Sequence, residues 1–417
     1  MRVLMFSNKQ PSNTKSSKKT VGGSWIDSLE KELLNYPEIE LGFVYSELAK
    51  KPNQFQLENS RTEYFMVPRH PYSKFDRWYN RFFCKPPSKK PLSGYLKVVT
   101  QYNPDVVLFF GTESDYSLIV PALKVPSVIW FQGNLTVYER MYENGMKIWS
   151  TLRFEKFKKI LMGDSLIHNF YAQTGLVARE REIFVNAKNF IGRTDWDRRV
   201  TSIMAPQANY FHCDETLREV FWKNKWKHVK GKDKFIITTT IRSNLYKGLE
   251  TIFETCKILN DLLAKEVVWR VIGVDTGVVY VKTAAKIAGV KVSESNVKLL
   301  GARFGDDLVE KLLDSDLYVH PSHIENSPNA VQEAMLLGMP VVATNCGGTP
   351  CMLENGKEGL LVQSKDPFAM AGAILEIVED PVAAQKMGEN ARKRAFQRND
   401  GKKICSDLLT IFDNLKM

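Results

Sequence analysis

The chain has 417 residues, more than a single hydrophobic core usually organises, so we expect two domains. Hydrophobic residues make up 44% of the chain and charged residues 25%, and both values are typical of a globular protein. No run of about 18 apolar residues could span a bilayer, and the start MRVLMFSNKQ turns polar too early for a secretion signal. These features favour a cytoplasmic protein over a secreted or integral membrane protein.

The positive charge is concentrated in the first half of the chain. The whole chain carries 58 Lys and Arg against 47 Asp and Glu, a net charge of +11. Residues 1–200 hold 30 of the basic and 20 of the acidic residues, whereas residues 201–417 hold 28 and 27. This imbalance suggests that the first half meets an anionic membrane surface, a phosphate-bearing substrate or nucleic acid. Solvated lysines without a partner are the alternative.

The six cysteines form no CxxC pair and no His/Cys cluster at zinc spacing. We therefore expect free thiols rather than a disulfide framework or a structural metal site.

Short apolar runs alternate with segments of helical periodicity along the whole chain. In the first half we predict strands at 2–7, 41–46, 105–111, 127–133 and 165–170, with a loop at 51–61. In the second half we predict strands at 234–240, 268–273, 297–301, 316–322 and 340–345. Such alternation is typical of βαβ units with parallel strands that are buried on both faces.

Two series of this kind predict an α/β protein with two doubly wound, Rossmann-like domains that face a cleft. The predicted division is 1–200 for the first domain and 201–395 for the second, with the joint somewhere in 192–215. The last part of the chain reads as two helices, the first of which starts at Pro381. The segment 396–417 is predicted to be a C-terminal helix that could return to the first domain.

Two glutamates eight positions apart lie around a predicted helix start. Glu325 follows the strand 316–322, and Ser327 and Pro328 have the residue types of an N-cap and a first helical position. Glu333 lies about one and a half turns into this helix, which stops at Gly338. Both carboxylates can therefore face one ligand, and the first amides of the helix, from 329 to 331, offer an anion site beside them.

Two cations follow another strand of the same half. Arg242 and Lys247 come after the strand 234–240, and the carboxyl ends of parallel strands share one edge of a sheet. Cations and amides suit a diphosphate, while carboxylates accept hydrogen bonds from sugar hydroxyls. The combination favours a nucleotide-sugar as the ligand.

The glutamate pair, the surrounding pattern PS…EAMLLGMPVVAT…GG and the Arg242…Lys247-Gly248 segment resemble the donor half of retaining glycosyltransferases of the GT-B fold, in the family of glycosyl transferases group one. The likeness is good over about 234–395 and looser in the first half. It implies that Glu325 contacts the donor sugar, Glu333 the ribose, and the two cations the diphosphate. The residues that it places at the donor site are Gly22, Gly23, Arg242, Lys247, Glu325, Asn326, Ser327, Asn329, Ala330 and Glu333.

One position departs from the family pattern. Many members carry a histidine after the strand that corresponds to 127–133, where this chain has Gln132. Glutamine can hydrogen-bond but cannot carry charge, so Gln132 is a candidate for orienting the acceptor or the sugar.

The resemblance implies a retaining hexosyltransferase in which Glu325, Arg242 and Lys247 are catalytic and no metal cofactor takes part. The donor would be linked to UDP or GDP, and the saccharide acceptor to a lipid diphosphate at the cytoplasmic face of the membrane. Such an enzyme would serve the assembly of a capsule, lipopolysaccharide or exopolysaccharide. The alternatives are a nucleotide-sugar epimerase of the same fold and a non-catalytic nucleotide-binding protein.

Other features of the sequence have simpler interpretations. The Asp-x-Asp patterns at 195–197 and 314–316 resemble metal-binding motifs, but the first lies in the predicted joint and the second between a helix and a strand. We expect His320 and His323 to shape the loop before Glu325.

The aromatic and basic stretches 70–91 and 147–163 suit a membrane surface, where the second would be an amphipathic helix. The alternative for the second stretch is a core-packing helix with a solvated basic face. No recognition motif supports nucleic acid as a partner.

Overall fold

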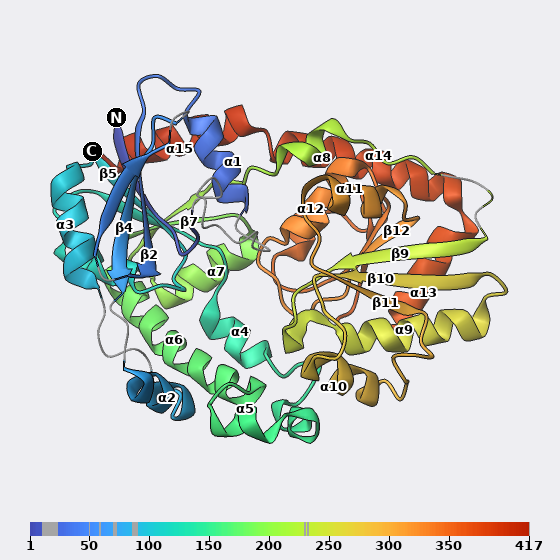
Figure 1. Cartoon of the computed structure of the whole chain (residues 1–417). Coiled ribbons are helices and arrows are strands. Elements are labelled where there is room, and N and C mark those ends of the chain that lie inside the picture. The colour runs from blue at the N-terminus through green and yellow to red at the C-terminus, as the bar shows by residue number, and fades with distance from the viewer. Residues whose placement is uncertain are drawn as a thin grey trace. The chain divides into compact units, whose positions relative to one another are not determined.

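The computed structural model describes residues 1–10, 24–49, 51–57, 60–69, 73–85, 91–228, 231 and 233–416. The chain forms two compact units (Figure 1). The first contains residues 1–139, 156–216 and 400–417, and the second contains residues 140–155 and 217–399. These boundaries differ from the predicted division, because 140–155 belongs to the second unit and 201–216 stays with the first.

The first unit is built on an eight-stranded sheet with the order β3-β4-β2-β1-β5-β6-β7-β8. All neighbouring strands are parallel except the edge strand β3, which is antiparallel to β4. The strands are β1 (Arg2–Phe6), β2 (Glu40–Leu48), β3 (Asn53–Gln56), β4 (Glu63–Arg69), β5 (Val106–Phe110), β6 (Ser127–Trp130), β7 (Asn189–Gly192) and β8 (Asn209–His212).

The central strands of this sheet are buried on both faces, which explains their continuous apolar runs. Val3 and Met5 of β1 point into one core cluster, while Leu4 and Phe6 point into the other. The helices of the unit are α1 (Ser24–Leu33), α2 (Lys74–Phe82), α3 (Leu92–Tyr102), η1 (Tyr116–Ala122), α5 (Phe157–Leu161), α6 (Leu166–Asn186), α7 (Asp195–Met204) and α15 (Gly401–Lys416), and α4 (Leu135–Met141) leads out of it.

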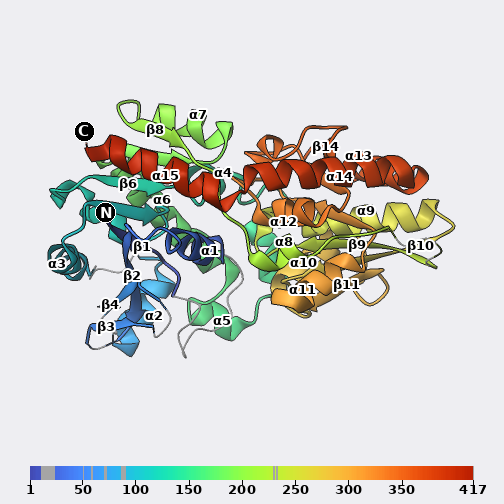
Figure 2. The ribbon, with the colours of Figure 1, turned by 90° about the horizontal axis from the view of Figure 1, so that it is seen from above.

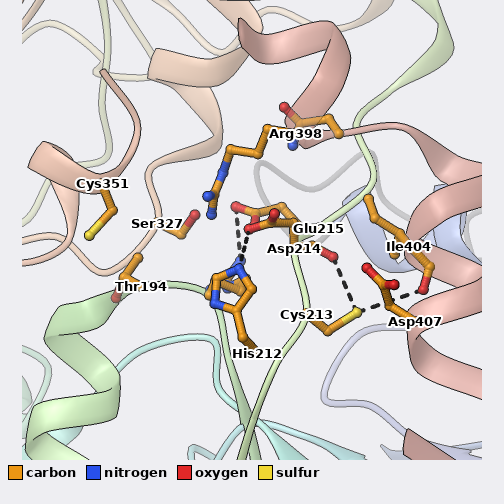
Figure 3. Close-up of polar contacts among 12 residues, drawn as sticks. Thr194, His212, Cys213, Asp214, Glu215, Ser327, Cys351, Arg398, Ile404 and Asp407 are labelled. Carbon is orange, nitrogen blue, oxygen red and sulfur yellow. Dashed lines mark hydrogen bonds and ion pairs between the residues drawn. The ribbon is translucent and has the colours of Figure 1, made fainter. Parts of the chain in front are cut away.

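The C-terminal helix α15 packs on the first unit, against α1 and β5 (Figure 2). Ile404 and Leu408 of α15 belong to the same core cluster as Val3 of β1. The Cys213 thiol, just after β8, donates to the carbonyl oxygen of Ile404 at 3.7 Å (Figure 3). Each predicted C-terminal helix is present, since α14 (Pro381–Arg398) begins at Pro381 and α15 follows it.

The second unit has a six-stranded, fully parallel sheet with the order β11-β10-β9-β12-β13-β14. One core cluster holds side chains of α8, α11, α12 and α14, while α9 packs against α10, α13 and β10. The strands are β9 (Lys234–Thr240), β10 (Glu266–Ile272), β11 (Val297–Gly301), β12 (Leu317–His320), β13 (Val341–Thr344) and β14 (Leu360–Val362). The helices are η2 (Ile148–Phe154), α8 (Glu219–Lys223), η3 (Leu245–Lys247), α9 (Leu249–Leu262), α10 (Val279–Ile287), α11 (Gly305–Leu313), α12 (Asn329–Leu337), η4 (Thr349–Cys351), α13 (Pro367–Glu379) and α14.

The predicted class, α/β with two doubly wound domains, is confirmed, but several elements differ. The predicted strand 165–170 is the start of helix α6, because the Ser165 hydroxyl caps the helix by accepting from the amide of His168 at 3.4 Å. The predicted joint 192–215 holds α7 and β8 instead of an irregular linker. The predicted loop 51–61 contains the edge strand β3. Strands β4, β7, β8 and β14 were not predicted.

The stretch 147–163 is not one amphipathic helix. The backbone is extended at Glu155 and Lys156, so the stretch forms the short helices η2 and α5. Helix η2 packs on α10 in the second unit, and α5 belongs to the first. None of the helices in the described ranges is long and apolar enough to cross a membrane.

Candidate active site

The centre of the site is a buried ion pair between Lys247 and Glu325. Lys247 Nζ donates to Glu325 Oε1, and the imidazole Nε2 of His320 is 2.9 Å from the same oxygen. The side chains are 15% exposed for Lys247 and 9% for Glu325. The structure therefore brings together one predicted cation and one predicted carboxylate, and it adds His320 to them.

Neighbouring parallel strands explain why these residues meet. Strand β9 pairs with β12, and the loops that carry Lys247 and Glu325 follow the carboxyl ends of these two strands. Gly248 lets the two loops approach, because a β-carbon there would lie 2.2 Å from the carbonyl oxygen of Pro321, and its φ of +73° also favours glycine. The amide of His323 then donates to the carbonyl oxygen of Tyr246 at 2.7 Å.

The ion pair fixes the charge of both partners. Burial alone would raise the pKa of Glu325, but Lys247 and His320 outweigh burial and hold that pKa well below its usual range. Burial would lower the pKa of Lys247, whereas Glu325 and Tyr246 raise it above its usual value. Glu325 is therefore a carboxylate and Lys247 an ammonium ion at neutral pH.

Glu333, the second glutamate of the motif, is held by an arginine that the sequence analysis missed. Arg218 Nε and Nη2 donate to Glu333 Oε1 and Oε2 at 2.8 and 2.7 Å. The Glu333 side chain is 7% exposed, and the arginine lies over the ring of Phe221 at 4.7 Å. Since Arg218 comes 115 residues before Glu333 and no local pattern links them, only the fold could reveal the pair.

The start of α12 differs in detail from the prediction. The helix begins at Asn329 with Pro328 at its N-cap and no side-chain cap, so Ser327 is not the capping residue. The Ser327 hydroxyl instead accepts from Gln332 Nε2 at 3.1 Å. The amide of Val331 donates to the carbonyl oxygen of Pro328 at 3.0 Å, so the expected anion site narrows to the amides of Asn329 and Ala330.

Of the remaining predicted site residues, Asn326 and Arg242 lie near the ion pair, whereas Gln132 does not belong to this unit. Asn326 is buried beside Glu325, and Arg242 is exposed in the loop after β9. Gln132 lies in the first unit, where its carbonyl oxygen accepts from Arg193 Nη2 at 3.0 Å and its side-chain amide donates to Phe110 at 3.4 Å. Gly22 and Gly23 lie outside the described residues. The roles proposed for all these residues stay predictions.

A second missed feature lies at the carboxyl edge of the first sheet, near Gln132. Glu113 follows β5, and its carboxylate folds over Gly111, where a β-carbon would lie 1.8 Å from Oε2. Burial, reinforced by the neighbouring carboxylate of Glu180, raises the pKa of Glu113 to about 7. Glu180 itself accepts from the amides of Leu135 and Thr136 and therefore fixes the start of α4.

The Asp-x-Asp patterns have structural roles. Asp197 accepts from the amide of Thr194 in a capping box of α7, and Asp316 accepts from the amide of Ile236 at 2.8 Å. Asp314 forms an ion pair with Arg270. Within the described part of the chain, no group of three or more His, Cys, Asp or Glu could hold a metal ion.

A family model matches most of the second unit. Residues 220–394 match the profile described as glycosyl transferases group 1. The chain is similar to N,N'-diacetylbacillosaminyl-diphospho-undecaprenol alpha-1,3-N-acetylgalactosaminyltransferase of Campylobacter jejuni, with 28% identity over 205 residues, 49% of this chain and 50% of that protein. The matched segments span at most about half the length of the first curated relatives.

The whole chain resembles solved structures at low sequence identity. Sucrose-phosphate synthase from Thermosynechococcus elongatus has a TM-score of 0.72 at 15% identity, over 99% of this chain and 98% of that one. The Anabaena protein Alr3699/HepE, solved with UDP and glucose, has a TM-score of 0.64 at 16% identity, over 99% of both chains. At such identities the likeness shows the fold, and it confirms the expected GT-B architecture. Residues 220–394 therefore match the family model of glycosyl transferases group 1, within a chain that has the GT-B fold.

Proposed function

We propose that the chain is a metal-independent, retaining glycosyltransferase that moves a sugar from a nucleotide-sugar donor to a saccharide acceptor. The observation that carries this proposal is the buried Lys247–Glu325 pair, which lies at the carboxyl edge of a glycosyl transferases group 1 domain. Ligands of open parallel sheets bind at that edge. The UDP complex of the Anabaena protein supports a nucleoside diphosphate as the group bound there.

In the proposed reaction the bond between the anomeric carbon and the diphosphate oxygen breaks, and its electron pair stays on the diphosphate. Arg242, Lys247 and the amides of Asn329 and Ala330 stabilise the charge that develops. The acceptor hydroxyl attacks on the face from which the diphosphate leaves, and its proton passes to the departing phosphate oxygen. Retention of configuration follows from this same-face attack.

Glu325 has a binding role in this scheme. It is ionised, so it can accept hydrogen bonds from donor sugar hydroxyls but cannot donate a proton. Because the same oxygen binds Lys247, the donor diphosphate and Glu325 compete for one ammonium group. Cations and amides provide the charge that a metal ion supplies in other glycosyltransferases, which is why we propose a reaction without metal.

The test is slow donor hydrolysis in the presence of EDTA, with UDP-glucose, UDP-N-acetylgalactosamine, UDP-N-acetylglucosamine and GDP-mannose as substrates. We expect release of nucleoside diphosphate from one of them, and NMR of the fresh product should show the anomer of the donor. Inhibition by EDTA would exclude the metal-free mechanism, and an inverted product would exclude retention.

The same assay separates the alternatives. A changed sugar that is still attached to the nucleotide would identify an epimerase. A nucleotide that binds without any turnover would identify a binding protein.

We propose a lipid diphosphate-linked saccharide as the acceptor, in the assembly of a capsule, lipopolysaccharide or exopolysaccharide. The Campylobacter relative is named for a diphospho-undecaprenol acceptor, which supports this class. The excess of positive charge in residues 1–200 supports it as well, because a diphosphate at an anionic membrane attracts a basic surface.

The first unit has an exposed surface that suits contact with an anionic membrane. Helices α2 and α5 are joined by a hydrogen bond of 2.9 Å from Trp78 Nε1 to the carbonyl oxygen of Leu161, and both lie next to α6 in Figure 1. We define the α2–α5 patch by its exposed apolar residues Phe75, Phe83, Phe157, Leu161 and Met162. The exposed charges of 73–85 and 155–164 are six cations and two acids, namely Arg77, Arg81, Lys85, Lys156, Lys158, Lys159, Asp76 and Asp164. Exposed apolar side chains together with an excess of exposed cations are typical of a surface that docks on anionic lipid.

Vesicle sedimentation tests the α2–α5 patch. We expect binding to vesicles that contain phosphatidylglycerol, weakened by salt, and little binding to phosphatidylcholine alone. Replacing Phe75 and Phe157, which are 67% and 73% exposed, by serine should reduce binding at least about tenfold, since each buries apolar area in the lipid. The matched control is Phe368→Ser, because Phe368 is 75% exposed on α13. Equal losses in both variants would show that the α2–α5 patch is not the docking surface.

A further inference from the structure

A segment from the first half of the chain is built into the second unit, where it contacts neighbours of Lys247 and Glu325. We call residues 140–155 the strap, since this segment lies between β6 and α6 in the sequence yet belongs to the second unit. Tyr142, Met146, Ile148 and Thr151 of the strap are all buried. The strap is therefore part of the core of this unit and not a surface linker.

The strap contacts the loop that carries Lys247. The rings of Tyr142 and Tyr246 meet edge to face, with their centroids 5.8 Å apart. Tyr246 directly precedes Lys247, and Lys247 Nζ lies 5.3 Å from the centre of the Tyr246 ring. The Tyr246 ring is thus in contact with the strap and with the cation of the site.

The strap also contacts the loop that carries Glu325. A β-carbon at Gly145 would lie 2.5 Å from Nε2 of His323 and 2.2 Å from Oε1 of Glu250. His323 and Glu250 are buried and joined at 2.5 Å, and the other imidazole nitrogen is 2.8 Å from Ser364 Oγ. His323 lies two residues before Glu325, so the strap contacts both loops of the site.

Space, and not backbone conformation, explains the glycine at 145. Gly145 is not among the glycines with positive φ, so an alanine could adopt its backbone without strain. The added methyl group would instead have to displace the His323–Glu250 pair. A buried pair of this kind tolerates displacement poorly, since its groups have no water to replace a lost partner.

From these contacts we infer that the strap positions the Lys247–Glu325 pair, with Tyr142 and Gly145 as its positioning residues. Tyr142 supports Tyr246, and the close fit at Gly145 fixes His323. The two loops are already joined by the hydrogen bond from His323 to Tyr246, so a shift of either one moves the pair. The catalytic consequence rests on the proposed function, but the structural consequence does not.

Hydrogen exchange of the full chain without nucleotide tests the structural consequence. We expect Gly145→Ala and Tyr142→Leu to speed amide exchange at least about tenfold in 245–250 and 320–327, because local opening follows the loss of packing. Tyr142→Phe keeps the ring and should keep the protection. The glycine control is Gly372→Ala in α13, where a β-carbon meets no atom within 4 Å. Unchanged exchange of both loops in Tyr142→Leu would overturn the inference, even if Gly145→Ala fails to fold.

Donor hydrolysis tests the catalytic consequence. For the folded fraction of Gly145→Ala we expect kcat with UDP-glucose, or with whichever donor the wild type hydrolyses, to fall about 10²-fold, as small misplacements at a reacting centre do. A purely structural role would lower Tm and leave the rate per folded molecule unchanged, which would also contradict the inference. If the wild type hydrolyses no donor, the proposed function fails while the exchange result still decides the role of the strap.

Discussion

Replacing Lys247 by methionine is expected to reduce release of nucleoside diphosphate by about 10²–10³-fold, because one preorganised donor to the leaving group is lost. The same change should destabilise the second unit by about 3–5 kcal/mol, since Glu325 stays buried without its main cation. Donor hydrolysis and thermal unfolding measure the two effects. The matched control is Lys291→Met, whose pair with Glu294 is exposed, so neither quantity should change much. A Lys247→Met variant with wild-type turnover would exclude a role in holding the leaving group.

Glu325→Gln should separate nucleotide binding from turnover of the donor. Without the carboxylate, Lys247 is released to the diphosphate, so the affinity for free UDP or GDP should be kept or increased while turnover of the donor sugar falls. The separation of binding from turnover distinguishes Glu325 from a residue that merely holds the fold together.

The pH dependence follows from the same pair. The pKa of Glu325 is depressed, so its contribution to stability is present above the unfolded value of about 4.3 and is lost as pH falls through the folded value. The pKa of Lys247 is raised, so its contribution persists below about 10.4 and is lost as pH rises through the folded value. Between about pH 5 and 9 neither Lys247 nor Glu325 should titrate. A loss of stability toward acid within this range that is absent from Glu325→Gln would contradict this assignment.

Arg218→Met is expected to cause the second large loss of stability. Both oxygens of Glu333 are bound by this one guanidinium group, so its removal leaves a buried carboxylate without compensation, at a cost of about 3–5 kcal/mol. The KM of the donor should rise as well if Glu333 contacts the ribose, because the carboxylate loses its orientation. Arg218→Lys should restore only part of both properties, since an ammonium group cannot make the two parallel hydrogen bonds.

A double variant provides the control for Arg218. Arg218→Met combined with Glu333→Leu removes both charges, so thermal unfolding should show a smaller loss than Arg218→Met alone. Equal losses would mean that the arginine stabilises the unit through its packing on Phe221 and not through Glu333.

The parts of the fold that could be predicted are those whose pattern is local. Central strands such as β1 and β9 are buried on both faces, so they appear as apolar runs. The strands that escaped prediction include β3, which is exposed at an edge, and β7, β8 and β14, which have three or four residues. At 165–170 the apolar residues suggested a strand, but the serine cap and the long helix behind it decided the outcome.

The residues of the site could also be predicted only where a local pattern places them. Lys247 and Glu325 could be placed together from the sequence, because each follows a strand and carboxyl ends of parallel strands share one edge. His320 ends β12 next to this edge, so its contact with Glu325 could have been foreseen. The contacts of Arg218 with Glu333 and of Gly145 with His323 join segments far apart in the chain, and only tertiary packing creates them.

The most direct measurement is a calorimetric titration of the wild type, Lys247→Met and Glu325→Gln with UDP and with GDP. If the Lys247–Glu325 pair belongs to a nucleotide-sugar site, one nucleotide binds the wild type, binds Lys247→Met at least about tenfold more weakly, and binds Glu325→Gln no more weakly than the wild type. Equal affinity of all three proteins, or no binding of either nucleotide, would show that the pair serves the fold and not a donor.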